Sequence, residues 1–132
     1  MKIMLFDESE ITYKRLQKLI SKGAGQDNHI VPVTDFDNIL MLTYRQHPDV
    51  IILNTYFLGG STLETIRILH TICPGVRIIA LTEFSEPAYL ELLNEAGSNY
   101  CLDLANQFQL LPDILAEIKN NHRTVENRIN FN

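Results

Sequence analysis

Short apolar runs alternate along this chain with longer segments in which apolar residues recur at helical spacing. The run at 50–53 is continuously apolar, which is typical of a strand buried on both faces of a parallel sheet. Parallel strands need long crossover connections, and these are usually helices. The alternation therefore limits the chain to α/β architectures in which helices cover both faces of a parallel sheet.

The predicted fold is a flavodoxin-like, doubly wound (βα)5 parallel sheet with strand order 2-1-3-4-5 and right-handed crossovers. One folded domain is expected over residues 1–120, followed by a polar tail at 121–132 that is expected to fray. The predicted strands are 2–6, 29–33, 50–53, 76–81 and 100–102, and the predicted helices are 10–22, a segment through 39–44, 63–72, a segment from 85 to 97, and 107–120.

Proline and small polar residues mark the ends of several predicted elements. Pro32 falls within the second strand, which predicts an edge strand because proline has no N–H to donate. Asp35 or Asp37 is expected to cap the second helix. Ser85 is expected to cap the fourth helix, with Pro87 in its first turn.

The composition excludes several classes of protein. The chain has 132 residues, 45% hydrophobic content and a net charge of −5, which indicates a globular domain and not a basic nucleic-acid binder. Cys73 and Cys101 form no CxxC pair, so reduced thiols and a cytoplasmic location are expected. We expect no signal peptide, and no apolar stretch reaches the ~18 residues that a membrane span needs.

Polar residues stand where the predicted first, third and fourth strands end. Asp7 and Glu8 follow the first strand, Asn54 the third and Thr82 the fourth. Because strands one and three are neighbours in the predicted order, Asp7, Glu8 and Asn54 are expected to meet at the carboxyl edge of the sheet. Paired carboxylates there suit a magnesium ion, although they could equally complement the dipole of the next helix.

These positions together resemble the receiver domain of bacterial two-component response regulators. The resemblance covers the chain from Lys2 to about Asn120 and rests on several segments in the family's order. They are Ile3-Met4-Leu5-Phe6-Asp7-Glu8-Ser9, Pro48-Asp49-Val50-Ile51-Ile52-Leu53-Asn54, Ile78-Ile79-Ala80-Leu81-Thr82 and Glu95-Ala96-Gly97-Ser98-Asn99.

The resemblance assigns a role to each residue at the edge. Asp7-Glu8 match the acidic pair that holds magnesium, and Thr82 matches the hydroxyl residue that contacts the phosphoryl group. The chain departs elsewhere: Asn54 stands at the phosphoacceptor aspartate, Leu104 at the lysine that pairs with the phosphoryl group, and Cys101 at the aromatic switch residue.

These departures predict a degenerate receiver that acts as a phosphorylation-independent signalling or protein-interaction module and is not an enzyme. An amide is not a nucleophile, and Leu104 carries no charge to balance a phosphoryl group. With Asn54 in place of a carboxylate, magnesium binding at Asp7 and Glu8 is expected to be weak or vestigial, and no other cofactor is expected.

The predicted partners are proteins, such as a histidine kinase or an output protein, and neither nucleic acid nor membrane. Receiver domains use the face of the fourth helix, fifth strand and fifth helix for dimers and targets. On this chain that face predicts a homodimer through Tyr89, Leu92 and Tyr100, since tyrosine is favoured at interfaces.

Two other functions stay open. One is a phospho-switched receiver with an unusual acceptor, such as Thr55 or Ser61. The other is a small flavodoxin-like ligand-binding protein, which would need a loop that cradles phosphate. Residues 58–62 hold only a loose glycine pair, and the chain has no P-loop.

Overall fold

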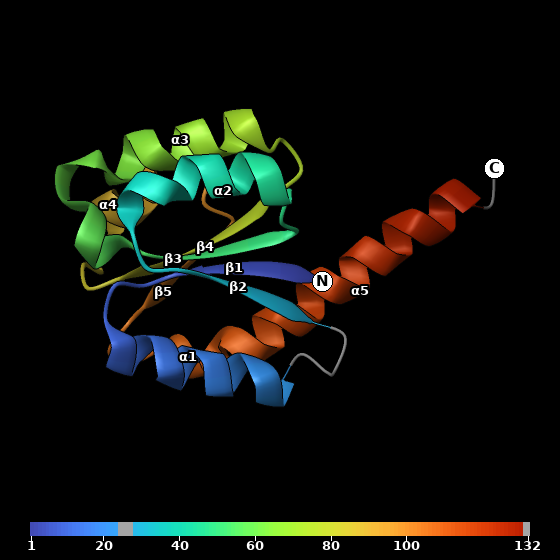
Figure 1. Ribbon diagram of the computed structural model, residues 1–132, viewed down its shortest axis with the longest axis horizontal. Helices are drawn as coiled ribbons and strands as arrows, with labels where there is room; N and C mark the ends of the chain where they lie inside the picture. The colour runs from blue at the N-terminus through green and yellow to red at the C-terminus, as the bar shows by residue number, and fades with distance from the viewer. Residues whose placement is uncertain (24–27, 131–132) are drawn as a thin grey trace.

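A computed structural model gives the structure of this chain and describes residues 1–23 and 28–130. Its centre is a five-stranded parallel sheet in the order β2-β1-β3-β4-β5, which confirms the predicted topology. Helices α2, α3 and α4 cover one face, and α1 and α5 cover the other (Figure 1). The strands are β1 (Lys2–Phe6), β2 (His29–Val33), β3 (Val50–Asn54), β4 (Arg77–Thr82) and β5 (Tyr100–Asp103), and the helices are α1 (Glu10–Gly23), α2 (Ile39–Gln46), α3 (Thr62–Ile72), α4 (Pro87–Ala96) and α5 (Leu111–Asn130).

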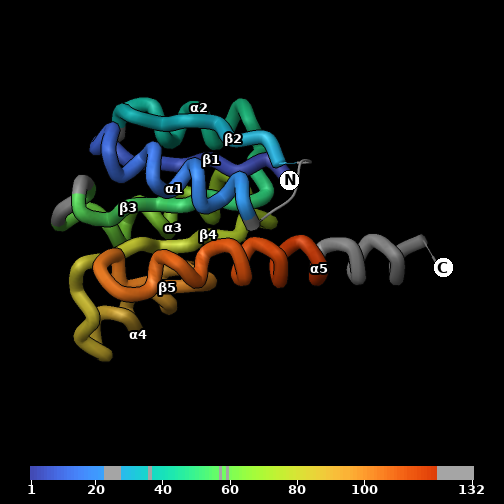
Figure 2. The backbone as a smooth tube through the Cα atoms, turned by 90° about the horizontal axis from the view of Figure 1, so that it is seen from below, coloured from blue at the N-terminus to red at the C-terminus, as the bar shows by residue number. Residues whose placement is uncertain are grey.

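Strand β3 lies at the middle of the sheet and divides the core into two halves. All of its residues are buried, as its continuous apolar sequence predicts. Side chains alternate along a strand, so Ile51 and Leu53 enter the core beneath α2, α3 and α4, whereas Val50 and Ile52 enter the core beneath α1 and α5. Seen from below, α1 and α5 run side by side across that second core (Figure 2).

The edge strand β2 is also as predicted. It pairs with β1 alone among the described strands, and it contains Pro32 opposite Leu5. Within the described part of the chain, no helix is both long enough and apolar enough to cross a bilayer.

Several predicted helix ends differ from the structure. Helix α2 begins after Asn38, which makes no capping hydrogen bond through its side chain, so the predicted Asp35 or Asp37 cap of this helix is wrong. Helix α4 begins after Glu86 and not after Ser85, and its first turn holds Pro87 as expected. Glu86 adopts extended backbone angles and makes no capping hydrogen bond through its side chain, so the predicted Ser85 cap is wrong. Helix α5 continues past the predicted end at Asn120 to Asn130, because the sequence beyond Asn120 holds neither glycine nor proline to stop it.

Candidate functional site

The register of the sheet brings Asp7 and Asn54 together at its carboxyl edge. Phe6 pairs with Leu53 across β1 and β3, so the residues that follow them are neighbours. The Nδ2 of Asn54 donates a hydrogen bond to Oδ2 of Asp7 over 3.0 Å. Both side chains are buried, and Asn54 is only 3% exposed. This contact confirms that the two positions meet despite their separation in sequence.

Both oxygens of the Asp7 carboxylate are engaged. Oδ2 accepts from Asn54, and Oδ1 accepts from the backbone N–H of Ser9 over 2.8 Å. Desolvation by burial raises the pKa of Asp7 above its ordinary value of 3.8, and the hydrogen bonds from Asn54 and Ser9 oppose that rise. Asn54 therefore supplies a neutral donor that stabilises the charged form of a carboxylate lying out of water.

The other end of the Asn54 amide is also engaged. Its Oδ1 accepts from the backbone N–H of Tyr56 over 3.1 Å, which starts the short 3₁₀ segment Thr55–Ser61. Asn54 thus caps a turn with its oxygen while its nitrogen reaches Asp7.

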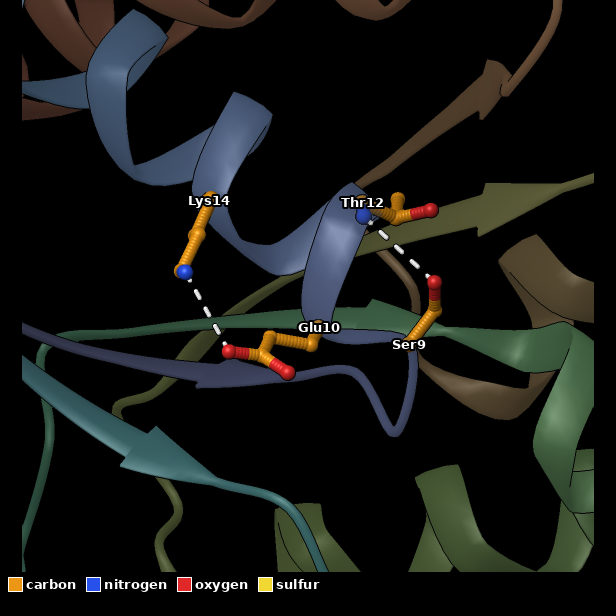
Figure 3. A network of polar contacts seen from close by, with 4 residues as sticks. All are labelled: Ser9, Glu10, Thr12 and Lys14. Carbon is orange, nitrogen blue, oxygen red and sulfur yellow. Dashed lines mark hydrogen bonds and ion pairs between the residues drawn. The ribbon is translucent and has the colours of Figure 1, made fainter.

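Glu8 does not join Asp7 as a second buried ligand. The Glu8 side chain is exposed. The next residue, Ser9, caps the start of helix α1, because its Oγ accepts a hydrogen bond from the Thr12 N–H over 3.4 Å. Figure 3 shows this cap beside the exposed Lys14–Glu10 ion pair, whose N···O distance is 3.2 Å. The edge near Asp7 and Glu8 opens into a pocket of about 390 Å³ that Lys14 also lines.

Asp7 and Glu8 are the carboxylates that a magnesium ion would meet at this edge. The ion prefers oxygen ligands in octahedral geometry, usually one or two carboxylates with waters. Here the Asp7 carboxylate accepts two hydrogen bonds and keeps further lone pairs, Glu8 is exposed, and Lys14 brings an opposing positive charge to the same pocket. Across residues 1–23 and 28–130, no group of three or more His, Cys, Asp or Glu side chains could hold a metal ion.

Thr82 is buried at the end of β4, and its hydroxyl serves the loop that follows. Its Oγ1 accepts from the Phe84 N–H over 3.0 Å and lies 3.3 Å from the Phe84 carbonyl oxygen, to which it can donate. The N–H of Leu104 donates to the Thr82 carbonyl oxygen over 2.9 Å, so the two positions adjoin as the resemblance implies. Leu104 itself packs towards the core beneath α1 and α5.

Cys101 lies on the opposite face of the sheet from Leu104, against the core beneath α4. Burial raises the pKa of its thiol, and a hydrogen bond with Ser98 opposes that rise. A thiol held protonated in this way fills the position of the aromatic switch residue without an aromatic ring.

The two alternative acceptor hydroxyls are both bonded to backbone carbonyls. Thr55 is buried and donates to the Leu81 carbonyl oxygen over 3.0 Å. Ser61 donates to the Leu58 carbonyl oxygen over 2.7 Å. Neither hydroxyl has a neighbouring general base in these hydrogen bonds that would activate it for attack on phosphorus.

The predicted dimer residues come from α4 and from the edge strand β5. Tyr89, in the first turn of α4, packs against the core beneath α2, α3 and α4, whereas Tyr100, at the start of β5, packs against the core on the other face. Leu92 is exposed on α4. The two tyrosines therefore approach the β5 edge from opposite faces of the sheet, and the dimer stays a prediction.

Removing the Asn54 amide should raise the pKa of Asp7. In the variant Asn54→Ala the hydrogen bond that lowers this pKa is lost, while burial still raises it. Carbon-detected NMR of the Asp7 carboxyl should show titration at higher pH than in the unmodified chain. The matched control Ser9→Ala keeps the backbone N–H that donates to Asp7, so it should leave the titration unchanged.

The same pKa fixes the sign of the effect of acid on stability. Because the folded pKa exceeds 3.8, the folded state holds the proton more tightly than the unfolded chain. The stability that protonated Asp7 contributes to the fold is therefore fully present below pH 3.8, the ordinary pKa, and is lost as the pH rises through the folded pKa. In Asn54→Ala that loss should occur at higher pH, and an unchanged Asp7 titration would contradict the role given to Asn54.

Comparison with known proteins extends the similarity beyond single residues. No model of a known protein family matches the sequence, and no curated protein matches it. Solved structures do match: a signal receiver domain of a DNA-binding response regulator from Colwellia psychrerythraea has a TM-score of 0.81 at 14% identity, with 90% of this chain and 98% of that chain covered. A response regulator from Thermotoga maritima gives 0.76 at 17% identity, covering 89% and 95%.

A third match has the same character. The REC domain of a response regulator from Geobacillus stearothermophilus gives a TM-score of 0.77 at 17% identity, with 95% of this chain and 97% of that chain covered. At these identities the likenesses show the fold, and they show it over nearly the whole chain.

Proposed function

We propose that this chain, which has the fold of response-regulator receiver domains, is a signalling module that binds protein partners without phosphoryl transfer. One observation supports the proposal above the others. At the position that the resemblance gives to the phosphoacceptor, the side chain is an amide whose nitrogen bonds Asp7 and whose oxygen caps the next turn.

The chemistry of phosphoryl transfer explains why that observation matters. The receiver reaction uses a carboxylate oxygen as the nucleophile that attacks phosphorus, with a metal ion and a lysine that balance the charge that develops. Asn54 has no nucleophilic oxygen, the Asp7 carboxylate accepts two hydrogen bonds, and Leu104 is apolar. Asn54 and Leu104 thus take away the nucleophile and the balancing cation, whereas Asp7, Glu8 and the Thr82 hydroxyl are retained.

Two alternatives are supported less well. A receiver phosphorylated on Thr55 or Ser61 would have to break the bond of that hydroxyl to a carbonyl oxygen. A flavodoxin-like ligand-binding protein would need a phosphate-cradling loop, and the described loops that follow the strands supply none of recognised sequence.

Partners of this module are proteins such as a histidine kinase or an output protein. A homodimer through Tyr89, Leu92 and Tyr100 is a further proposal, and light scattering across a wide concentration range tests it. Leu92→Ala removes the exposed side chain of that set and should weaken any such dimer.

Incubation with acetyl phosphate and magnesium, followed by intact mass measurement, tests the central proposal. The unmodified chain should gain no phosphoryl group, and beryllofluoride should leave its NMR spectrum unchanged. The matched control is the double variant Asn54→Asp/Leu104→Lys, which restores a nucleophile and a cation at this edge and should gain a labile phosphoryl group. A phosphoryl group mapped to Thr55, Ser61 or any other residue of the unmodified chain would reject the proposal.

A further inference from the structure

An aromatic pocket lies beside the Asn54 site and takes no part in it. It has a volume of about 330 Å³ and is formed where the loop after β3 meets the loop after β4 and the first turn of α4. We call it the aromatic pocket, and its lining residues are Thr55, Tyr56, Glu83, Phe84 and Tyr89.

Its walls are large aromatic side chains that remain open to water. Tyr56 is 61% exposed and Phe84 is 59% exposed, although burying such side chains usually stabilises a protein. The Phe84 ring meets the Tyr89 ring edge to face, with centroids 5.9 Å apart and planes at 78°. Two loops thus hold exposed aromatic faces around one hollow, and the core does not explain this arrangement.

The charge around the pocket is negative. Glu83 lines it, and the exposed Glu86 immediately precedes α4, the helix that contributes Tyr89 to the pocket. The sequence has no Lys, Arg or His between His47 and Arg67 or between Arg77 and Lys119, the stretches that contain both pocket loops. The start of α4 contributes roughly half a positive charge, which is less than the two full negative charges of the glutamates. The net field therefore favours a cation.

We infer that the aromatic pocket binds an arginine side chain from a basic segment of a partner protein. The inference rests on the proposed function, since it names the chemistry of a partner for that module. A guanidinium group stacks on aromatic faces and pairs with carboxylates in a planar fork, which matches the ring walls and Glu83. The chain already uses this contact once, because the Arg15 guanidinium lies over the Phe108 ring at 5.0 Å from its centroid.

The openness of the pocket favours a peptide anchor over a free small cation. A small-molecule site usually encloses most of its ligand, whereas Tyr56 and Phe84 leave the hollow open to solvent. An arginine that enters it would stay attached to a partner whose backbone continues across the surface. The surrounding glutamates would then meet further basic residues of the same segment.

A titration of the isotope-labelled full chain tests the inference. The probe is an amidated peptide with three arginines separated by glycines, added at low ionic strength, and NMR follows the backbone amides. The matching peptide with citrulline in place of arginine keeps the shape of the side chain and removes its charge. The arginine peptide should shift the amides of Tyr56, Glu83 and Phe84, and the citrulline peptide should not.

Variants separate the pocket from general attraction to an acidic protein. Phe84→Ala and Glu83→Gln should each weaken binding of the arginine peptide roughly fivefold, as loss of one cation–π or ion-pair contact predicts. Both side chains are exposed, so the fold should be retained. The control Glu91→Gln removes an equally exposed charge farther along α4 and should change the affinity less than twofold.

Several outcomes would overturn the inference. The first group concerns the peptides: binding of the citrulline peptide as tight as that of the arginine peptide, or no shift of the pocket amides. The second concerns the variants, if Glu91→Gln weakens binding as much as Glu83→Gln does. The third concerns other occupants: tetramethylammonium that saturates the pocket at the concentration that suffices for the peptide, or the basic α1 of a second copy that fills it. Binding to the pocket by a chain that also accepts a phosphoryl group would reject the proposed function and keep this inference. A chain that accepts no phosphoryl group and does not bind the arginine peptide would keep the proposed function and reject this inference.

Discussion

In the variant Asn54→Asp the melting temperature should fall by roughly 20 °C in metal-free buffer at neutral pH. The hydrogen bond from Nδ2 of Asn54 to Asp7 spans 3.0 Å, so the substitution places a second carboxylate oxygen against the first. Two unit charges at ~4 Å repel by on the order of 4 kcal/mol at an effective dielectric of 20. The hydrogen bond to a charged group, worth about 1.5–3 kcal/mol, is lost as well.

Magnesium should change the melting temperature of this variant and not that of the unmodified chain. The carboxylate that the substitution introduces would join Asp7 and Glu8 as a third, and a divalent cation would relieve their repulsion. An ion present at about 100 times its dissociation constant adds roughly 2.7 kcal/mol of stability, which would restore several degrees. In the unmodified chain the Asn54 amide already compensates Asp7, so millimolar magnesium should leave its melting temperature nearly unchanged.

Two controls isolate the effect of the carboxylate charge that Asn54→Asp adds. Asn54→Ala removes the amide without adding a carboxylate, so it should lose stability and gain none from magnesium. Sodium chloride at matched ionic strength separates screening from binding. A rise of several degrees for the unmodified chain in magnesium, or an Asn54→Asp variant that is as stable as the parent without metal, would contradict this account of the edge.

Gly97→Ala should destabilise the fold by about 2–4 kcal/mol, through backbone strain and a steric clash that act together. Gly97 ends α4 with a φ of 123°, a conformation that residues with a side chain rarely adopt. A Cβ built there would overlap the imidazole ring of His70, which contacts the Gly97 carbonyl oxygen from the last turn of α3. Urea unfolding followed by circular dichroism measures the loss.

Gly75→Ala is the matched control for that substitution. Gly75 lies in the turn after α3, where an added Cβ has nothing within 4 Å and the φ is not positive. The same chemical change should therefore be neutral or slightly stabilising, since alanine restricts the unfolded chain more than glycine does. Equal effects of the two variants would show that Gly97 is not specifically required at the end of α4.

The order of the strands could be predicted because it depends on local sequence patterns and on general rules for parallel sheets. The apolar run of β3 predicts a central strand, and Pro32 predicts the edge position of β2. The meeting of Asp7 with Asn54 followed from that order alone. Helix ends were harder: the side chain of Ser85 suits a cap, but the chain turns into α4 one residue later, at Glu86.

The details of the site depend on contacts that no sequence pattern encodes. That the Asn54 oxygen would cap Tyr56, and that the Thr82 hydroxyl would accept from Phe84, depends on the local loop conformation. The aromatic pocket was missed because Tyr56 and Phe84 come from separate loops and meet only when the register of β3 and β4 is known. A pair of exposed aromatics just after two neighbouring strands was the signal that could have found it.

The single proline of β2 affects how this protein behaves at high protein concentration. The N–H of His29 donates to Met1 and the carbonyl of Val33 accepts from Asp7, so alternate residues of β2 turn towards β1. Pro32 lies between these inward-facing positions and faces the outer rim, where it offers no donor to an incoming strand. That rim is thereby less able to pair with a strand of another chain, which lowers the tendency of this edge of the sheet to aggregate.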